Sequence, residues 1–120
     1  MALNISSYDK RNDIIAFHKG FATGEKFDGN LDIGDLILDM STKGRVRGLE
    51  IMNATEFLKD FGITEKILEN LISAQFEAAL KPGSILISIS LKAKNMIHDI
   101  PVKIAVQLSE PITAQQPSTA

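Results

Sequence analysis

Two apolar rows in the last third of the sequence constrain the fold more than any other feature. Over residues 85–91, and again over residues 100–108, every second residue is isoleucine, leucine or valine, and most residues between them are polar or small. This period of two predicts two β-strands that form a hairpin and bury one shared face. Placing Ile89 opposite Ile100 puts both apolar rows on that face, whereas a slip of one residue would bury lysine.

Pro101 lies within the second of these strands. A proline cannot donate a hydrogen bond to a β-ladder, which favours an edge strand. A long β-branched hairpin at an edge exposes backbone donors and acceptors, and these must be covered by the chain itself, by a second copy or by a different protein. We therefore expect a homo-oligomer, or a protein partner bound at this hairpin. The residues expected to bind the partner are Ile100, Val102, Lys103 and Lys92.

The first half of the sequence predicts two further hairpins. Apolar residues flank a polar turn at 9–13, and apolar residues also flank a turn at 41–44. Gly48 interrupts the alternation after the second turn, which indicates a β-bulge. Residues 18–34 contain four glycines and predict a long connection without regular structure.

Two helices are expected before the last hairpin. Asn53 begins a capping box and predicts a short helix that ends at Gly62. Thr64 can cap a second helix, whose apolar residues recur every three or four positions up to Leu80 before Pro82 ends it. The order ββ-ββ-αα-ββ predicts an α+β fold, a largely antiparallel sheet of β-hairpins with two helices packed on one face.

Length and composition limit the possible functions. A chain of 120 residues with 44% hydrophobic residues predicts one domain, expected over residues 1–108, followed by a flexible tail over 109–120. The absence of cysteine excludes disulfides and thiol chemistry. A net charge of -2 argues against nucleic-acid binding. Apolar runs too short for a membrane span and an N-terminus unlike a signal peptide predict a cytoplasmic protein.

Acidic residues on the second hairpin form the strongest candidate ligand site. Pairing across its four-residue turn places Asp35 opposite Glu50, and two like charges in that position need a cation or a basic neighbour. Carboxylate pairs suit Mg²⁺ or Mn²⁺, and Asp13 on an adjacent strand could add a third ligand. The alternative interpretation is a set of solvent-facing acids screened by Arg45 or Arg47.

Other chemistry is poorly supported by the sequence. His18 and His98 are 80 positions apart, and no serine has the spacing of a catalytic triad with them. The segment from Gly20 to Lys26 lacks the glycine spacing of a phosphate-binding loop. The last hairpin has no aromatic residues between its lysines, so we rank nucleic-acid binding last. These lysines are Lys92, Lys94 and Lys103.

An ordered set of glycines and acids in the first half carries a family resemblance. Its residues are Tyr8, Asp9, Asp13, Ile15 and Phe17, then the segments 33–39 and 44–51, then Asn53 and Ala54. This pattern resembles the domain of unknown function 2283 family over about residues 8–58. The sequence departs from that family in the glycine-rich insertion between the first two hairpins. The resemblance implies no catalytic residue, and it implies that the chain acts beside a small toxin-like protein, as its antitoxin-like partner.

These observations lead to two predictions of function. The first is a small non-enzymatic protein-interaction module that acts through the last hairpin or a helix face. The alternative is a divalent-metal or small-ligand binder, or a hydrolase, that uses Asp35, Glu50 and Asp13. No cofactor other than a divalent cation is expected.

Overall fold

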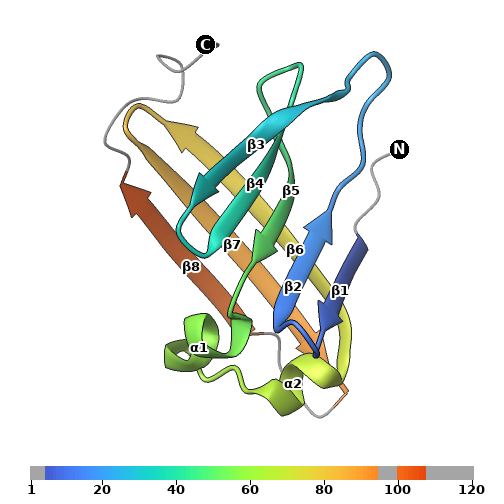
Figure 1. Cartoon of the computed structure of the whole chain (residues 1–120), viewed down its shortest axis with the longest axis vertical. Coiled ribbons are helices and arrows are strands. Elements are labelled where there is room, and N and C mark those ends of the chain that lie inside the picture. The colour runs from blue at the N-terminus through green and yellow to red at the C-terminus, as the bar shows by residue number, and fades with distance from the viewer. Residues whose placement is uncertain (1–4, 95–99, 108–120) are drawn as a thin grey trace.

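Two antiparallel sheets face each other in the computed structural model, which describes residues 5–94 and 100–107 (Figure 1). The larger sheet has the strand order β1-β2-β5-β4-β3, and the smaller sheet has the order β6-β7-β8. The strands of the larger sheet are β1 (Ile5–Asp9), β2 (Ile14–His18), β3 (Phe27–Ile33), β4 (Leu36–Ser41) and β5 (Val46–Ile51). Those of the smaller sheet are β6 (Leu71–Lys81), β7 (Ser84–Ala93) and β8 (Ile100–Gln107).

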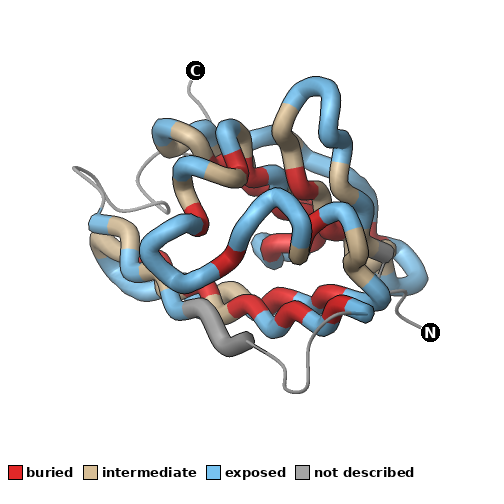
Figure 2. The backbone as a smooth tube through the Cα atoms, turned by 90° about the horizontal axis from the view of Figure 1, so that it is seen from below, coloured by how far each residue is buried: buried red, intermediate tan, exposed pale blue. Residues whose placement is uncertain are grey.

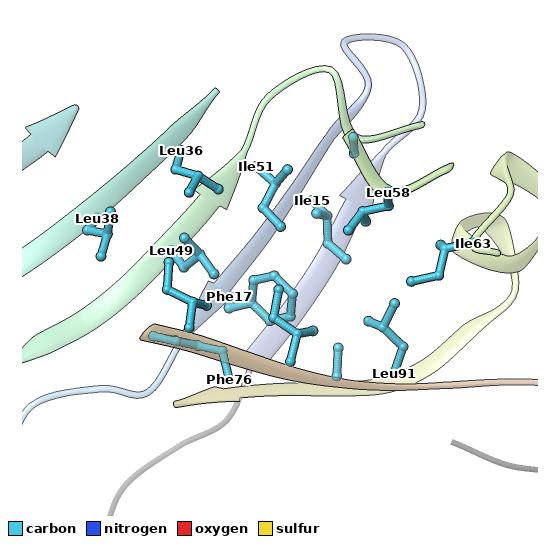
Figure 3. Close-up of a cluster of buried hydrophobic side chains, with 14 of the residues drawn as sticks. Ile15, Phe17, Leu36, Leu38, Leu49, Ile51, Leu58, Ile63, Phe76 and Leu91 are labelled. Atoms are coloured by element: carbon cyan, nitrogen blue, oxygen red, sulfur yellow. The ribbon is translucent and has the colours of Figure 1, made fainter. Parts of the chain in front are cut away.

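The hydrophobic core lies between the sheets. The rings of Phe17 on β2 and Phe76 on β6 meet edge to face, with their centroids 5.7 Å apart (Figure 3). Ile15 and Leu49 from the larger sheet and Leu91 from the smaller one are at most 1% exposed. Figure 2, viewed from below, shows the buried positions concentrated between the two layers. Each sheet therefore buries one face against the other, as in a β-sandwich.

Three short helical segments close one end of the sandwich (Figure 1). They are α1 (Ala54–Leu58), the 3-10 helix η1 (Lys59–Phe61) and α2 (Glu65–Glu69), and they connect β5 to β6. Leu58, Ile63 and Leu68 from this connection are each 1% exposed and extend the core. Thr64 caps α2 by accepting a hydrogen bond from the Ile67 amide, which confirms the predicted cap.

The fold class and all three predicted hairpins are confirmed. In the last hairpin, Ile89 pairs with Val102 rather than with Ile100. The predicted register was therefore wrong by two residues. Because side chains alternate with a period of two, a shift of two keeps the apolar rows of both strands on one face.

The predicted second helix is wrong beyond Glu69. The chain continues as β6, in which Ala74 and Phe76 are buried while Gln75 and Glu77 are exposed. The ladder to β7 runs from Leu71↔Ala93 to Lys81↔Ser84. Those backbone bonds and the contact of Phe76 with Phe17 outweigh the helical spacing of the apolar residues. A second sheet therefore covers the first, in place of two helices on one face.

The predicted connection over residues 18–34 is also partly wrong, because its second half forms β3. This strand pairs with β4 from Phe27↔Ser41 to Ile33↔Leu36. Gly34 turns the chain between them at φ +59, in the left-handed region that glycine enters without strain.

The predicted tail over 109–120 lies outside the described residues, and so does His98. Within the described ranges, no helix has the length and apolar character needed to cross a membrane.

Candidate functional site

The carboxylates predicted to face each other on the second hairpin do not do so. Glu50 pairs with Ile37, and Asp39 pairs with Gly48. Asp35 instead precedes β4, and its Oδ1 accepts a hydrogen bond from the Asn53 side chain at 3.1 Å. The prediction that Asp35 lies opposite Glu50 is therefore wrong.

A shift of one residue at the turn and a β-bulge after it together account for the difference in register. The pairing of β4 with β5 shifts between Asp39 and Met40, so that Arg47 lies between the paired positions Val46 and Gly48. This irregularity agrees with the bulge predicted at Gly48. Asp39 packs so closely over Gly48 that a Cβ atom there would lie 2.3 Å from Asp39 Oδ2. The close approach of Asp39 explains why a glycine occupies the bulge.

Asp13 is engaged in a structural role, as a cap for α1 from a neighbouring turn. Its carboxylate accepts hydrogen bonds from the Thr55 amide at 3.1 Å, the Thr55 hydroxyl at 2.7 Å and the Tyr8 hydroxyl at 2.7 Å. Burial acts to raise the pKa of Asp13, but the bonds from Thr55 and Tyr8 lower it below its ordinary value. Burial, together with the bond to Asp13, raises the pKa of Tyr8. In the part of the chain that the structure describes, no three histidine or acidic side chains gather to hold a metal ion.

A buried ion-pair cluster, which the sequence did not reveal, fixes the glycine-rich loop. The Glu25 side chain is fully buried and accepts hydrogen bonds from Arg45 Nε at 2.8 Å and from the Ala22 amide at 2.9 Å. The Ser41 hydroxyl also donates to it. The bond from Arg45 holds the pKa of Glu25 far below its usual range. This carboxylate joins the loop before β3 to the turn between β4 and β5, and we assign it a structural role.

An open groove of about 370 Å³ lies between β1 and the corner where α2 enters β6. On one side it is lined by Ser6, Ser7 and Tyr8, three consecutive residues of β1. Among the described residues, β1 is at the edge of its sheet and forms a ladder only with β2, and β6 of the other sheet lies beside it. The volume lies at the lower end of the range for ligand-binding pockets in proteins.

The opposite wall of the groove is apolar. It is formed by Leu68 at the end of α2 and by Leu71 and Ile72 at the start of β6. The pairing of β6 with β7 shifts between Leu71 and Ser73, and the Ile72 side chain is 56% exposed.

The edge strand β8 carries most of the residues predicted to bind a partner. Within the described residues it pairs only with β7, which confirms the predicted edge position. Lys103 is exposed opposite Ser88, and Lys92 is exposed on β7 four positions further along. The backbone of Ile100 and Val102 belongs to β8, and their side chains lie outside the described part. The role of these residues in binding stays a prediction.

The fold defines a small α+β protein with two facing antiparallel sheets. Over 86 residues the chain is 35% identical to an uncharacterized protein of Methanocaldococcus jannaschii, covering 71% of this chain and 67% of that protein. The chain belongs to the family of this uncharacterized protein. No protein-family model and no solved structure matches the chain. The resemblance to the domain of unknown function 2283 family stays a prediction.

Proposed function

We propose that this protein is a non-enzymatic protein-interaction module that self-associates through β8. The observation that carries the proposal is an edge strand whose apolar row is only half covered. Ile104 and Val106 on β8 are partly buried, whereas Ile87 and Ile85, their partners on β7, are at most 1% exposed. A second copy paired along β8 would continue the sheet and cover this row. A cytoplasmic location, expected from the sequence, is part of this proposal.

Pro101 indicates which main-chain amides of β8 point toward the free edge. It has no amide hydrogen and pairs with Ser90 of β7. The ladder to β7 keeps all its bonds only if position 101 turns its amide toward the free edge. Alternation along an antiparallel strand then turns the amides of Lys103 and Ala105 the same way.

The free main-chain groups of Lys103 and Ala105 suit a symmetric pairing of β8 with β8 of a second copy. A twofold axis at Ile104 would place Lys103 opposite Ala105 of the second copy, and the two residues would exchange main-chain hydrogen bonds. In this register no lysine lies directly opposite another lysine, so the repulsion that usually protects an edge strand is reduced to the diagonal pair of Lys103 side chains, about 7–8 Å apart. A different protein, such as the partner implied for antitoxin-like relatives, could use the same free groups.

The test is the oligomeric state of two variants at one position. Ala105→Pro would remove an amide from the free edge and leave the ladder to β7 intact, as Pro101 already does. Ala105→Val, the matched control, keeps the amide and favours a strand. Sedimentation velocity should show a dimer for the wild-type chain and the Val variant, and a monomer for the Pro variant.

Two results would contradict the proposal. One is a wild-type chain that stays monomeric at the highest soluble concentration. The other is an Ala105→Pro variant that dimerises as strongly as the wild type. Circular dichroism of the Pro variant shows whether it keeps its strands, so that a monomer is not mistaken for an unfolded chain.

A further inference from the structure

We propose that the loop between β2 and β3 and the turn between β4 and β5, with the strand ends that adjoin them, form a binding site for single-stranded nucleic acid. These two segments, hereafter the basic tip (residues 19–28 and 41–47), lie at the end of the molecule away from the helical segments (Figure 1). The basic tip contains no residue of β8, so the proposal does not depend on self-association.

Positive charge is concentrated in the basic tip. Its 17 residues include five basic and two acidic residues, a net charge of +3, whereas the rest of the chain has eight basic and 13 acidic residues, a net charge of -5. The net charge of -2 for the whole chain therefore conceals two regions of opposite sign. The acidic remainder repels a polyanion, which directs an oligonucleotide to the basic tip.

Three of the five basic side chains are available to a ligand. Lys26 and Lys43 are exposed, and the Arg45 side chain is 46% exposed. The Lys19 side chain is only 12% exposed and is held in an ion pair at 2.8 Å. The Arg47 side chain is 10% exposed and donates hydrogen bonds to main-chain oxygens of the loop. A ligand at the basic tip would therefore meet two lysines and one arginine.

The buried acid of the basic tip does not cancel these charges. Glu25 binds Arg45, and its Oε1 also lies 3.8 Å from Arg47 Nε. One carboxylate between two guanidinium groups leaves this cluster with a net charge of +1. The other acid is Asp28, which is exposed and is already included in the net charge of +3.

Hydrogen bonds hold the three available cations on one frame. The Lys26 amide donates to Thr42 Oγ1 at 3.0 Å, and the Thr42 amide donates to the Lys26 carbonyl at 2.8 Å. Lys43 Nζ donates to a carbonyl oxygen of the loop at 3.4 Å, and the bond from Arg45 to Glu25 joins the same two segments. The backbone that carries the cations is thus ordered before a ligand arrives, which lowers the entropic cost of binding.

Phe27 supplies an aromatic surface beside these cations. It is 53% exposed, more than any other phenylalanine of the chain. It follows Lys26 directly and pairs with Ser41 of β4, so the side chains of Phe27 and Ser41 lie on the same face of the sheet. The Ser41 hydroxyl donates to Glu25, the carboxylate that binds Arg45. The ring and the guanidinium group therefore share one face.

An exposed ring among cations suits a nucleic acid whose bases are unpaired. A base stacks on the ring while the neighbouring phosphates contact the basic side chains. The bases of a duplex are already stacked on one another, so a duplex would use the cations alone. An acidic peptide would likewise leave the ring uncovered. The lysines of the last hairpin lack such a ring, which is the difference between that surface and the basic tip.

The test is a titration of a fluorescein-labelled single strand of about 12 nucleotides, as DNA and as RNA, with the full chain, followed by fluorescence anisotropy. Contact with about three phosphates predicts that the affinity falls about 20-fold between about 50 and 200 mM salt. Lys43→Gln should weaken binding and make the salt dependence less steep. Lys92→Gln is the matched control, because Lys92 is an exposed lysine of β7 outside the basic tip. It should leave the affinity and the salt dependence unchanged.

Variants of Phe27 separate base stacking from attraction by charge alone. Phe27→Leu keeps an apolar side chain without a ring, and it should weaken binding at least about fivefold at each salt concentration. Its salt dependence should match that of the wild type, because no cation is lost. Phe27→Tyr keeps the ring and should bind as the wild type does. Circular dichroism of each variant shows whether the strands are kept.

Four results would overturn the proposal. The first is a single strand that does not bind at about 50 mM salt. The second is binding that Phe27→Leu and Lys43→Gln both leave unchanged. The third is a duplex of the same sequence that binds as tightly as the single strand. The fourth is displacement of the labelled strand by polyglutamate as effectively as by the unlabelled strand, which would show a site for any polyanion.

Discussion

Replacement of Gly48 by alanine tests the close packing at the β-bulge of the second hairpin. A Cβ atom at this position would lie 2.3 Å from Oδ2, 3.0 Å from Cγ and 3.1 Å from Cβ of Asp39. Favourable contacts between carbon atoms begin at about 3.5 Å, so the Asp39 side chain would have to move. It would then give up the hydrogen bond that it accepts from the Asn30 side chain at 2.6 Å.

The expected cost follows from these contacts. Overpacking a buried site costs about 1–3 kcal/mol, and an exposed hydrogen bond adds about 0.5–1 kcal/mol. Alanine also restricts the conformations of the unfolded chain, which stabilises the folded state by about 0.4–1 kcal/mol. Gly48→Ala should therefore lower the free energy of unfolding by about 2 kcal/mol, within a range of about 0.5–3.5 kcal/mol, and Tm should fall by about 3–6 °C for each kcal/mol lost.

The assay is urea unfolding followed by far-ultraviolet circular dichroism, because the chain has no tryptophan for fluorescence. A double-mutant cycle with Asp39→Ala isolates the clash, since that change removes the two nearest atoms. The two substitutions should be less destabilising together than the sum of each alone, by at least about 0.5 kcal/mol. Additive effects, or a Gly48→Ala variant as stable as the wild type, would refute the account of the bulge.

Three other substitutions test the core, the helix cap and the buried ion pair. Phe76→Leu should cost about 1–2 kcal/mol in urea unfolding, because it loses the edge-to-face contact with Phe17; no loss would mean that the rings do not meet. Asparagine at position 13 tolerates the left-handed φ of +57 but accepts fewer hydrogen bonds than aspartate. Asp13→Asn should therefore lower the free energy of unfolding by about 1 kcal/mol and speed amide exchange at Thr55. The lowered pKa of Glu25 means that the stability it confers is complete above its ordinary value of 4.5 and falls as the pH drops toward the lowered folded value. Glu25→Gln should flatten this acid dependence of the urea midpoint, and an unchanged pH profile would contradict the ion-pair assignment.

The hairpins could be predicted because their strands carry their own pattern. In β7, every second residue from Ile85 to Leu91 is buried, and this alternation is visible in the sequence alone. The exact partner of each residue was harder to predict, because register depends on the turn, and the turn sequences do not specify it. This is why the last hairpin was predicted with the correct face but a register wrong by two. In the second hairpin the turn and the bulge at Gly48 each shift the pairing by one residue, which is why Asp35 was wrongly placed opposite Glu50.

The segment that forms β6 could not be assigned from local pattern. Its apolar residues fit a helical spacing, and Phe76 belongs to both the helical and the strand interpretation. The choice is made by contacts with residues distant in sequence, namely the ring of Phe17 and the ladder to β7. The strand β3 was missed for a different reason. Leu31 and Ile33 alternate with the exposed Asp32, a signal that the surrounding glycines obscured.

The groove beside β1 had no sequence signal, because its walls come from segments about sixty residues apart. Ser6 and Tyr8 have no feature that marks them as lining residues until α2 and β6 are placed against β1. The buried Glu25 is a similar case, since only the fold brings Arg45 to it. Chemistry carried by side chains of one strand can be predicted from sequence, whereas a surface made by two sheet edges requires the fold.

The arrangement of the edge strands supports β8 as the surface proposed for self-association. The edge strands β1 and β6 lie beside each other, so that each shields the other. The edge of β8 is protected instead by Pro101 and Lys103. Proline has no amide to donate to a β-ladder, and a lysine repels another lysine placed opposite it, so both residues discourage pairing in most registers. A register centred on Ile104 keeps the missing donor of Pro101 away from the middle of the strand and places no lysine directly opposite another. An edge that favours one register in this way is suited to binding a single defined partner, and the Ala105 variants test that register directly.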